Sequence, residues 1–215
     1  QGVYCIGAWI RDSMAGIGTM TYYDPARGTF GALGHGINDV DTGNLMDIAE
    51  GTLYNTEIIS IKKGKNGDPG ELTGFIEYDD RNIFGAITGN SPKGVFGVCD
   101  PKIMEEANTD YLPIALKQDI HLGEATVICS LGERVESYAA EIVDIHLEND
   151  NVNRGLELKV TDKRLLETTG GIIQGMSGAP ILQEGRIVGA VTHVLVNDPT
   201  RGYGIFIESM LEEAG

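Results

Sequence analysis

Apolar residues along the chain come in short runs that are separated by Gly, Pro, Asn and Asp. Short runs rich in Val, Ile, Tyr and Phe and bounded by turn residues are typical of β-strands. In the first half we therefore expect strands at residues 3–10, 16–24, 29–34, 57–63, 71–78, 83–89 and 94–99. In the second half we expect them at 111–117, 124–132, 137–148, 155–162, 178–183, 186–196 and 202–207. This pattern predicts an all-β protein with two packed β-barrels or a sandwich.

Two segments instead have the features of helices. The segment "DKRLLETT" begins at Asp162, a good N-cap residue, and stops at two glycines, and the segment "ESMLEEA" lies at the end of the chain. A turn-rich stretch at residues 100–110 predicts the division of one domain, residues 1–215, into an N-terminal barrel of about 1–105 and a C-terminal barrel of about 106–215.

Composition supports the strand-rich interpretation and excludes several functions. Glycine contributes 30 of 215 residues, about twice its usual share, and tight turns repeatedly need its positive φ. A formal net charge of −16 argues against nucleic-acid binding, which needs clustered Lys and Arg. No apolar run approaches the ~20 residues that span a bilayer. Since the chain begins at Gln1 without an initiator Met, we expect an excised or processed domain.

The three cysteines, Cys5, Cys99 and Cys129, are far apart and odd in number. This favours small buried apolar residues over a disulfide framework, although the sequence leaves a single bridge open.

The segment "GMSGAP" is the strongest candidate for chemistry. Glycine two residues before Ser177 allows the backbone to point N–H groups at a developing oxyanion, and Gly178 removes a side chain beside the hydroxyl. The pattern G-x-S-G-x-P followed by a strand is the one that double-barrel serine proteases use. The alternative is a glycine-rich hairpin turn with a Ser that takes no part in chemistry.

A serine nucleophile needs a base, and the chain has four histidines. His35 precedes Ser177 by 142 residues and lies among Gly and Ala, which fits a base from one barrel and a nucleophile from the other. His193 is close to Ser177 along the chain, so we expect it, with Thr192, to line the substrate pocket. His121 and His146 lie in or near polar turns.

Long joined motifs, "FGALGHGINDVDTG", "KVTDKRLLETTGGIIQGMSGAPI" and "GAVTHVLVNDPTRGYGIFIESML", resemble the SpoIVB family of serine peptidases of spore-forming bacteria. The resemblance covers nearly the whole chain and implies a chymotrypsin-like fold. It implies that His35 is the base, Ser177 the nucleophile and Asp162 of "KVTD" the third member. Family members usually carry a membrane anchor and a PDZ domain before the peptidase domain.

The third member of the triad has alternatives. It would accept a hydrogen bond from the far ring nitrogen of His35. Asp162 precedes Ser177 by only fifteen residues and also suits a helix N-cap. Asp79 or Asp80 follows His35 at a spacing nearer to the usual one in double-barrel proteases, so either could take this role.

The residue before the nucleophile is Met176, where proteases activated by N-terminal cleavage carry an Asp. That activation switch is therefore not expected. The backbone N–H groups of Gly175 and Ser177 would hold the oxyanion, and the strand "GAVTHVLV" would offer its edge to the substrate chain.

We expect no cofactor and no metal. The segment "DVDTGNLMDIAE" has acidic residues at three positions of a Ca²⁺ loop, but Asn44 replaces the glycine of its sharp turn, which favours a polar loop. The resemblance implies a protease that acts between the mother-cell and forespore membranes, on itself and on a membrane-bound regulator of an intramembrane protease. The alternative is a catalytically silent, protease-like module that binds a protein partner through its cleft.

Overall fold

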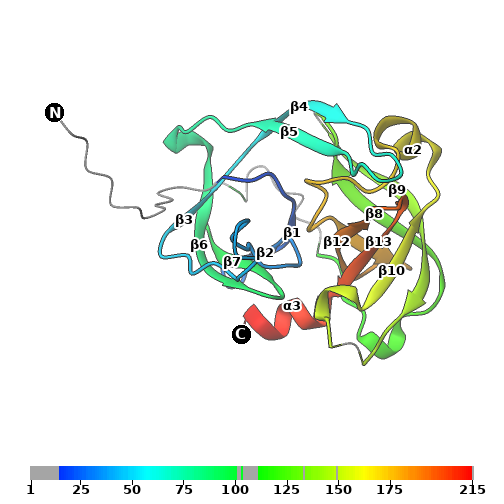
Figure 1. Ribbon diagram of the computed structural model, residues 1–215. Coiled ribbons are helices and arrows are strands. Elements are labelled where there is room, and N and C mark those ends of the chain that lie inside the picture. Colours follow the sequence, from blue (N-terminus) through cyan, green and yellow to red (C-terminus); the bar gives the residue numbers. More distant parts are fainter. Residues whose placement is uncertain (1–14, 101–102, 104–110, 133, 149, 215) are drawn as a thin grey trace.

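The computed structural model describes residues 15–100, 103, 111–132, 134–148 and 150–214. Two β units lie side by side, one from each half of the chain (Figure 1). The first unit is an antiparallel sheet, β1-β2-β7-β6-β3, composed of β1 (Met20–Asp24), β2 (Thr29–Ala32), β7 (Gly94–Cys99), β6 (Ile83–Ser91) and β3 (Gly51–Tyr54). A hairpin of β4 (Glu57–Lys62) and β5 (Glu71–Phe75) extends from it.

The second unit is a closed antiparallel barrel in the order β10-β13-β12-β11-β8-β9. Its strands are β8 (Gly123–Ser130), β9 (Val135–Ile145), β10 (Leu156–Val160), β11 (Pro180–Gln183), β12 (Arg186–Leu195) and β13 (Asp198–Phe206). Alternate residues of β8 and β9 are buried, as the period of two in a strand requires. The all-β class is confirmed. The first sheet, in contrast, is not closed by pairing between β1 and β3 among the described residues.

Both expected helices are present. Helix α2 (Lys163–Thr169) is capped by the Asp162 carboxylate and ends at Gly170, whose φ of 78° is the left-handed conformation that glycine favours. Helix α3 (Ile207–Ala214) closes the described chain. Short 3₁₀ turns are η1 (Asp80–Asn82), η2 (Lys117–Asp119) and η3 (Val152–Arg154). None of the helices in the described ranges is long and apolar enough to cross a membrane.

Two of the predicted strands are not among the strands that the structure describes. The segment 111–117 is not a strand: it forms only a single bridge, Ile114 with Ile187, before η2 begins. Pro113 within it lacks the N–H that a ladder needs. The predicted strand at 3–10 lies outside the described residues, and β3 was not predicted.

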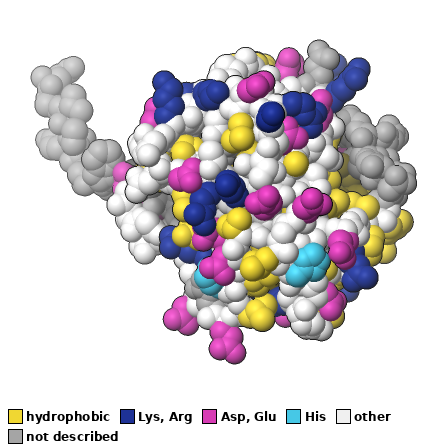
Figure 2. All heavy atoms as spheres, turned by 90° about the vertical axis from the view of Figure 1, so that its right-hand side faces the viewer, with side chains coloured by type: hydrophobic (Ala, Val, Ile, Leu, Met, Phe, Trp, Pro, Cys, Tyr) yellow, Lys and Arg dark blue, Asp and Glu magenta, His cyan; other side chains and the backbone are white. Residues whose placement is uncertain are grey.

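The main hydrophobic core fills the closed barrel and includes Leu158, Ile181 and Val191. A smaller cluster joins the two units, because Phe96 of β7 packs with Ala190, Ile205 and Met210 of the second half. Side-chain charges of both signs are interspersed over the outer face of the barrel (Figure 2). The packing between the units places the loop before β11 against the residue after β2, since a Cβ on Gly178 would lie 2.6 Å from the Leu33 nitrogen.

Candidate active site

The loop before β11 holds Ser177 between two glycines in the left-handed region. Gly175 has φ 97° and Gly178 has φ 94°. A Cβ on Gly178 would collide with the carbonyl oxygen of Thr19, so this glycine permits close contact between the two units. The loop also receives a hydrogen bond of 2.9 Å from the Thr19 N–H at the Ser177 carbonyl. Both glycines are therefore needed to hold Ser177 at the junction of the two halves.

The N–H groups around Ser177 divide into two sets. Met176 N–H donates to the Ile173 carbonyl and Gly178 N–H donates to the Val191 carbonyl. The N–H groups of Gly175 and Ser177 donate no hydrogen bond to any described residue. These two donors are the pair expected to bind an oxyanion, and the fold leaves them unused.

His35 lies just after β2, where Leu33 and Gly34 both have positive φ. His35 Nδ1 is 2.9 Å from the Gly36 carbonyl oxygen. Because a carbonyl can only accept, Nδ1 carries the proton and donates it, which leaves a lone pair on Nε2. The ring is half-buried and in the tautomer that a general base requires.

Ser177 and His35 each contact β12, at neighbouring residues. The Ser177 hydroxyl donates to the Thr192 carbonyl at 2.8 Å. The next residue, His193, packs its ring against His35, with 5.0 Å between the ring centroids. The two imidazoles also line one pocket of about 230 Å³, together with Asn38 and other residues. The structure therefore places Ser177 beside Thr192 and His35 beside His193, at adjacent residues of β12, and Ser177 is not among the residues that line the pocket.

Asn153 links these segments, and sequence reasoning missed it. Its side-chain amide donates to the Gly34 carbonyl at 2.6 Å and to the Pro92 carbonyl at 2.8 Å. Its own carbonyl accepts the Thr192 hydroxyl at 2.6 Å. Asn153 thus fixes the residue before His35 and the residue before His193. The sequence carries no signal for this, because an Asn in a polar loop is ordinary turn composition.

His193 differs electrostatically from an ordinary histidine. His193 is an exposed residue, yet loss of hydration around its ring, followed by the effects of His35 and Arg154, lowers its pKa to about 4. His193 is therefore neutral at neutral pH and offers the pocket an uncharged donor and acceptor.

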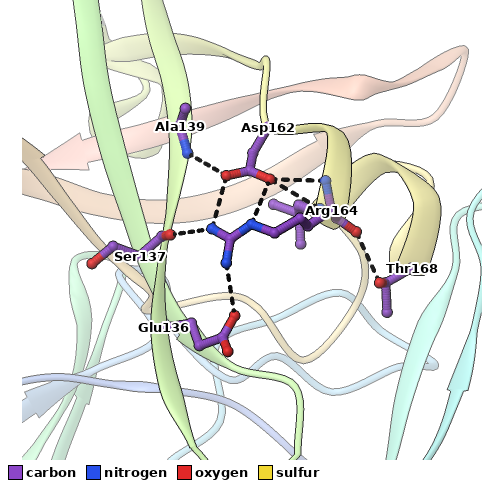
Figure 3. A network of polar contacts seen from close by, with 7 residues as sticks. Glu136, Ser137, Ala139, Asp162, Arg164 and Thr168 are labelled. Carbon is purple, nitrogen blue, oxygen red and sulfur yellow. Dashed lines mark hydrogen bonds and ion pairs between the residues drawn. The ribbon is translucent and has the colours of Figure 1, made fainter.

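The structure does not bring Asp162 to His35. Asp162 caps α2, accepts from the Ala139 N–H and forms an ion pair of 3.0 Å with Arg164, which also reaches Glu136 (Figure 3). Hydrogen bonding to Arg164 is the main reason that the pKa of Asp162 falls to about 2. Asp79 caps η1 and pairs with Arg81. Within the described residues, the His35 ring is hydrogen-bonded only to a carbonyl.

Two other predictions concern sites outside this cluster. Asp39, in the loop after His35, uses its carboxylate to accept from the N–H groups of Asp41 and Thr42, as in an ordinary polar turn. Cys99 and Cys129 are free thiols, while Cys5 lies outside the described residues.

Comparison with protein-family models decides the family. A model described as SpoIVB peptidase S55 matches residues 2–211. The chain belongs to the SpoIVB peptidase S55 family. Membership confirms the enzyme class that the sequence motifs imply, a serine endopeptidase, and, with the closed barrel, the chymotrypsin-like fold class.

Among solved structures, two forms of a protease from M. tuberculosis are similar to this chain. The active form of the Rv3671c protease is 15% identical with a TM-score of 0.45, and the match covers 67% of this chain and 63% of that chain. The inactive form of the same protease is 14% identical with a TM-score of 0.43, covering 69% of this chain and 73% of that chain. This chain thus spans less than two thirds of the active form's length. A search of curated proteins finds no match.

Proposed function

We propose that this member of the S55 family cleaves peptide bonds with Ser177 as nucleophile and His35 as general base. The observation that carries the proposal is the Ser177 loop, where two glycines at positive φ flank the hydroxyl and the N–H groups of Gly175 and Ser177 are unused. Losing one oxyanion donor typically costs about 100- to 1,000-fold in rate, so two unused donors beside a hydroxyl support a role in acyl transfer.

In the proposed reaction the Ser177 side chain rotates away from the Thr192 carbonyl and presents its hydroxyl to His35 Nε2. His35 takes the hydroxyl proton as Oγ attacks the peptide carbonyl, then delivers it to the leaving amine. Water then hydrolyses the acyl-enzyme. The Gly36 carbonyl holds the required tautomer of His35, the role that sequence reasoning gave to a carboxylate.

Strand β12 supplies the proposed docking site for the substrate chain. Its pairing with β11 ends at Ala190, whereas its pairing with β13 continues to Leu195. The edge at residues 192–195 therefore has no strand on the side of β11 among the described residues, and an extended peptide could pair with it. Neutral His193 would favour an acidic or amide side chain in the adjoining pocket.

We further propose the substrates and place of action that the family implies: the enzyme itself, and a membrane-bound regulator of an intramembrane protease, in the space between mother cell and forespore. The test incubates the purified protein with such a regulator in detergent and maps the fragments by mass spectrometry. We expect fragments with the wild type and none with Ser177→Ala. Identical fragments from both proteins would contradict the proposed substrate. So would a regulator that stays intact when it is incubated with wild-type protein whose Ser177 is shown to be reactive.

A further inference from the structure

The β4–β5 hairpin of the first unit packs on the second unit, over the segment that leads to Ser177. Figure 1 shows the hairpin running across to the side of the closed barrel. Leu72 of β5 is only 4% exposed and belongs to the main core of the barrel, although it comes from the other half of the chain. Ile58 and Ile61 of β4 pack against the same cluster.

Backbone hydrogen bonds tie the hairpin to this segment along its length. Gly64 N–H donates to the Thr169 carbonyl at 2.8 Å, at the end of α2. Gln174 is held twice: its N–H donates to the Gly70 carbonyl at 2.9 Å and its carbonyl accepts from the Leu72 N–H at 2.8 Å. The segment before Ser177 is thus attached to β5 by an isolated parallel bridge between Gln174 and Glu71.

This attachment fixes the direction of one oxyanion donor. In a trans peptide the C=O of one residue and the N–H of the next point in opposite directions. Because the Gln174 carbonyl points at the Leu72 N–H, the Gly175 N–H of the same peptide must point away from the hairpin. Turning this peptide over would remove the donor from the site and break the bond to β5.

The Leu72 side chain also packs against this peptide, at Gly175. A Cβ on Gly175 would lie 2.9 Å from the Leu72 Cβ, so the glycine backbone rests directly on this leucine. On the next peptide, the Thr19 hydroxyl donates to the Gly175 carbonyl at 3.2 Å. Both contacts come from the first half of the chain.

We propose that the β4–β5 hairpin fixes the Gln174–Gly175 peptide in its oxyanion-binding orientation, with Leu72 as the positioning residue. The hairpin would thereby do the work that an Asp before the nucleophile does in proteases activated by cleavage; here that position is Met176, which is fully buried. The inference rests on the proposed role of Ser177. Leu72 acts only through Gly175 and touches no reacting atom.

The test compares Leu72→Ala with Leu158→Ala, a matched control in which a fully buried leucine of the same core lies on β10. Both variants lose stability, because both leave a cavity. The measured quantity is the second-order rate constant for labelling by a fluorophosphonate, at a temperature where both variants are folded. We expect labelling at least tenfold slower in Leu72→Ala, with near wild-type rates in Leu158→Ala and in the conservative variant Leu72→Met.

Further readouts separate this role from general destabilisation. The pH dependence of labelling should keep its wild-type shape in Leu72→Ala, because this change leaves His35 unaltered. If Leu72→Ala does not fold, Leu72→Val takes its place in the comparison. Equal labelling rates in the Leu72 and Leu158 variants would overturn the inference while leaving the nucleophile in place. A wild type that is not labelled at Ser177 would instead overturn the proposed function itself.

Discussion

His35 and His193 have different proposed roles, although the centroids of their rings lie only 5.0 Å apart. His35 donates from Nδ1 to a carbonyl and keeps Nε2 available, which suits the proposed role of a base. His193 is neutral because loss of hydration, followed by the effects of His35 and Arg154, lowers its pKa. The sequence predicts the two roles from the order of the residues along the chain, and these roles stay predictions. It could not give the ring contact, which depends on the packing of β12 against the loop after β2.

The lowered pKa of His193 predicts a specific acid sensitivity. Its folded pKa of about 4 lies below the unfolded value of 6.5, so the unfolded state binds more protons between these pH values. The contribution of His193 to the free energy of unfolding is therefore fully present above pH 6.5 and is lost as the pH falls toward 4. Since His193 is partly exposed, we expect a loss on the order of 1 kcal/mol. Urea unfolding should show that His193→Gln loses less of its free energy of unfolding between pH 6.5 and 4 than the wild type does.

The control for this prediction is His121→Gln. A hydrogen bond to the Leu122 carbonyl and one to Glu184 raise the pKa of His121, the opposite direction. Removing His121 should thus make the protein more sensitive to acid, not less. The same pH dependence in wild type and His193→Gln would mean that His193 is not held neutral by its surroundings.

At the scale of elements, helix α2 shows what local sequence can and cannot give. The N-cap at Asp162 and the stop at Gly170 are confirmed, because both depend on residues within one turn. The network of Asp162 with Ala139 and Glu136 joins α2 to β9 and was not predicted, since no local pattern specifies partners more than twenty residues away. The same limit applies to Leu72 beneath Gly175.

The network at α2 predicts that Asp162 and Arg164 act together. Asp162→Asn keeps a capping oxygen but loses the ion pair, and Arg164→Ala loses the same pair. We expect each change to lower the free energy of unfolding by less than about 1 kcal/mol, and the two variants to label with a fluorophosphonate at similar rates. If Asp162→Asn, but not Arg164→Ala, lowered the labelling rate by about 10⁴-fold, Asp162 would be acting on His35 as the third member of a triad.

At the scale of the whole molecule, the proposed site depends on the packing of the two units. The proposed base, His35, and Leu72 come from the first half, while Ser177 and β12 come from the second. The order of His35 before Ser177 predicts a site shared between the halves, and the roles of the two residues stay predictions. The sequence did not predict how the halves join, because the hairpin, Thr19 and Asn153 make their contacts over long separations.

The most direct measurement of the central claim is covalent labelling by a fluorophosphonate probe, with the modified residue mapped by mass spectrometry. Phosphonylation requires a serine activated by a base and an oxyanion site to receive the phosphoryl oxygen. The account predicts one adduct on Ser177 in the wild type, and none at this position in Ser177→Ala. In His35→Ala the rate should fall at least a hundredfold. Absence of the adduct from the folded wild type, or undiminished labelling in His35→Ala, would contradict it.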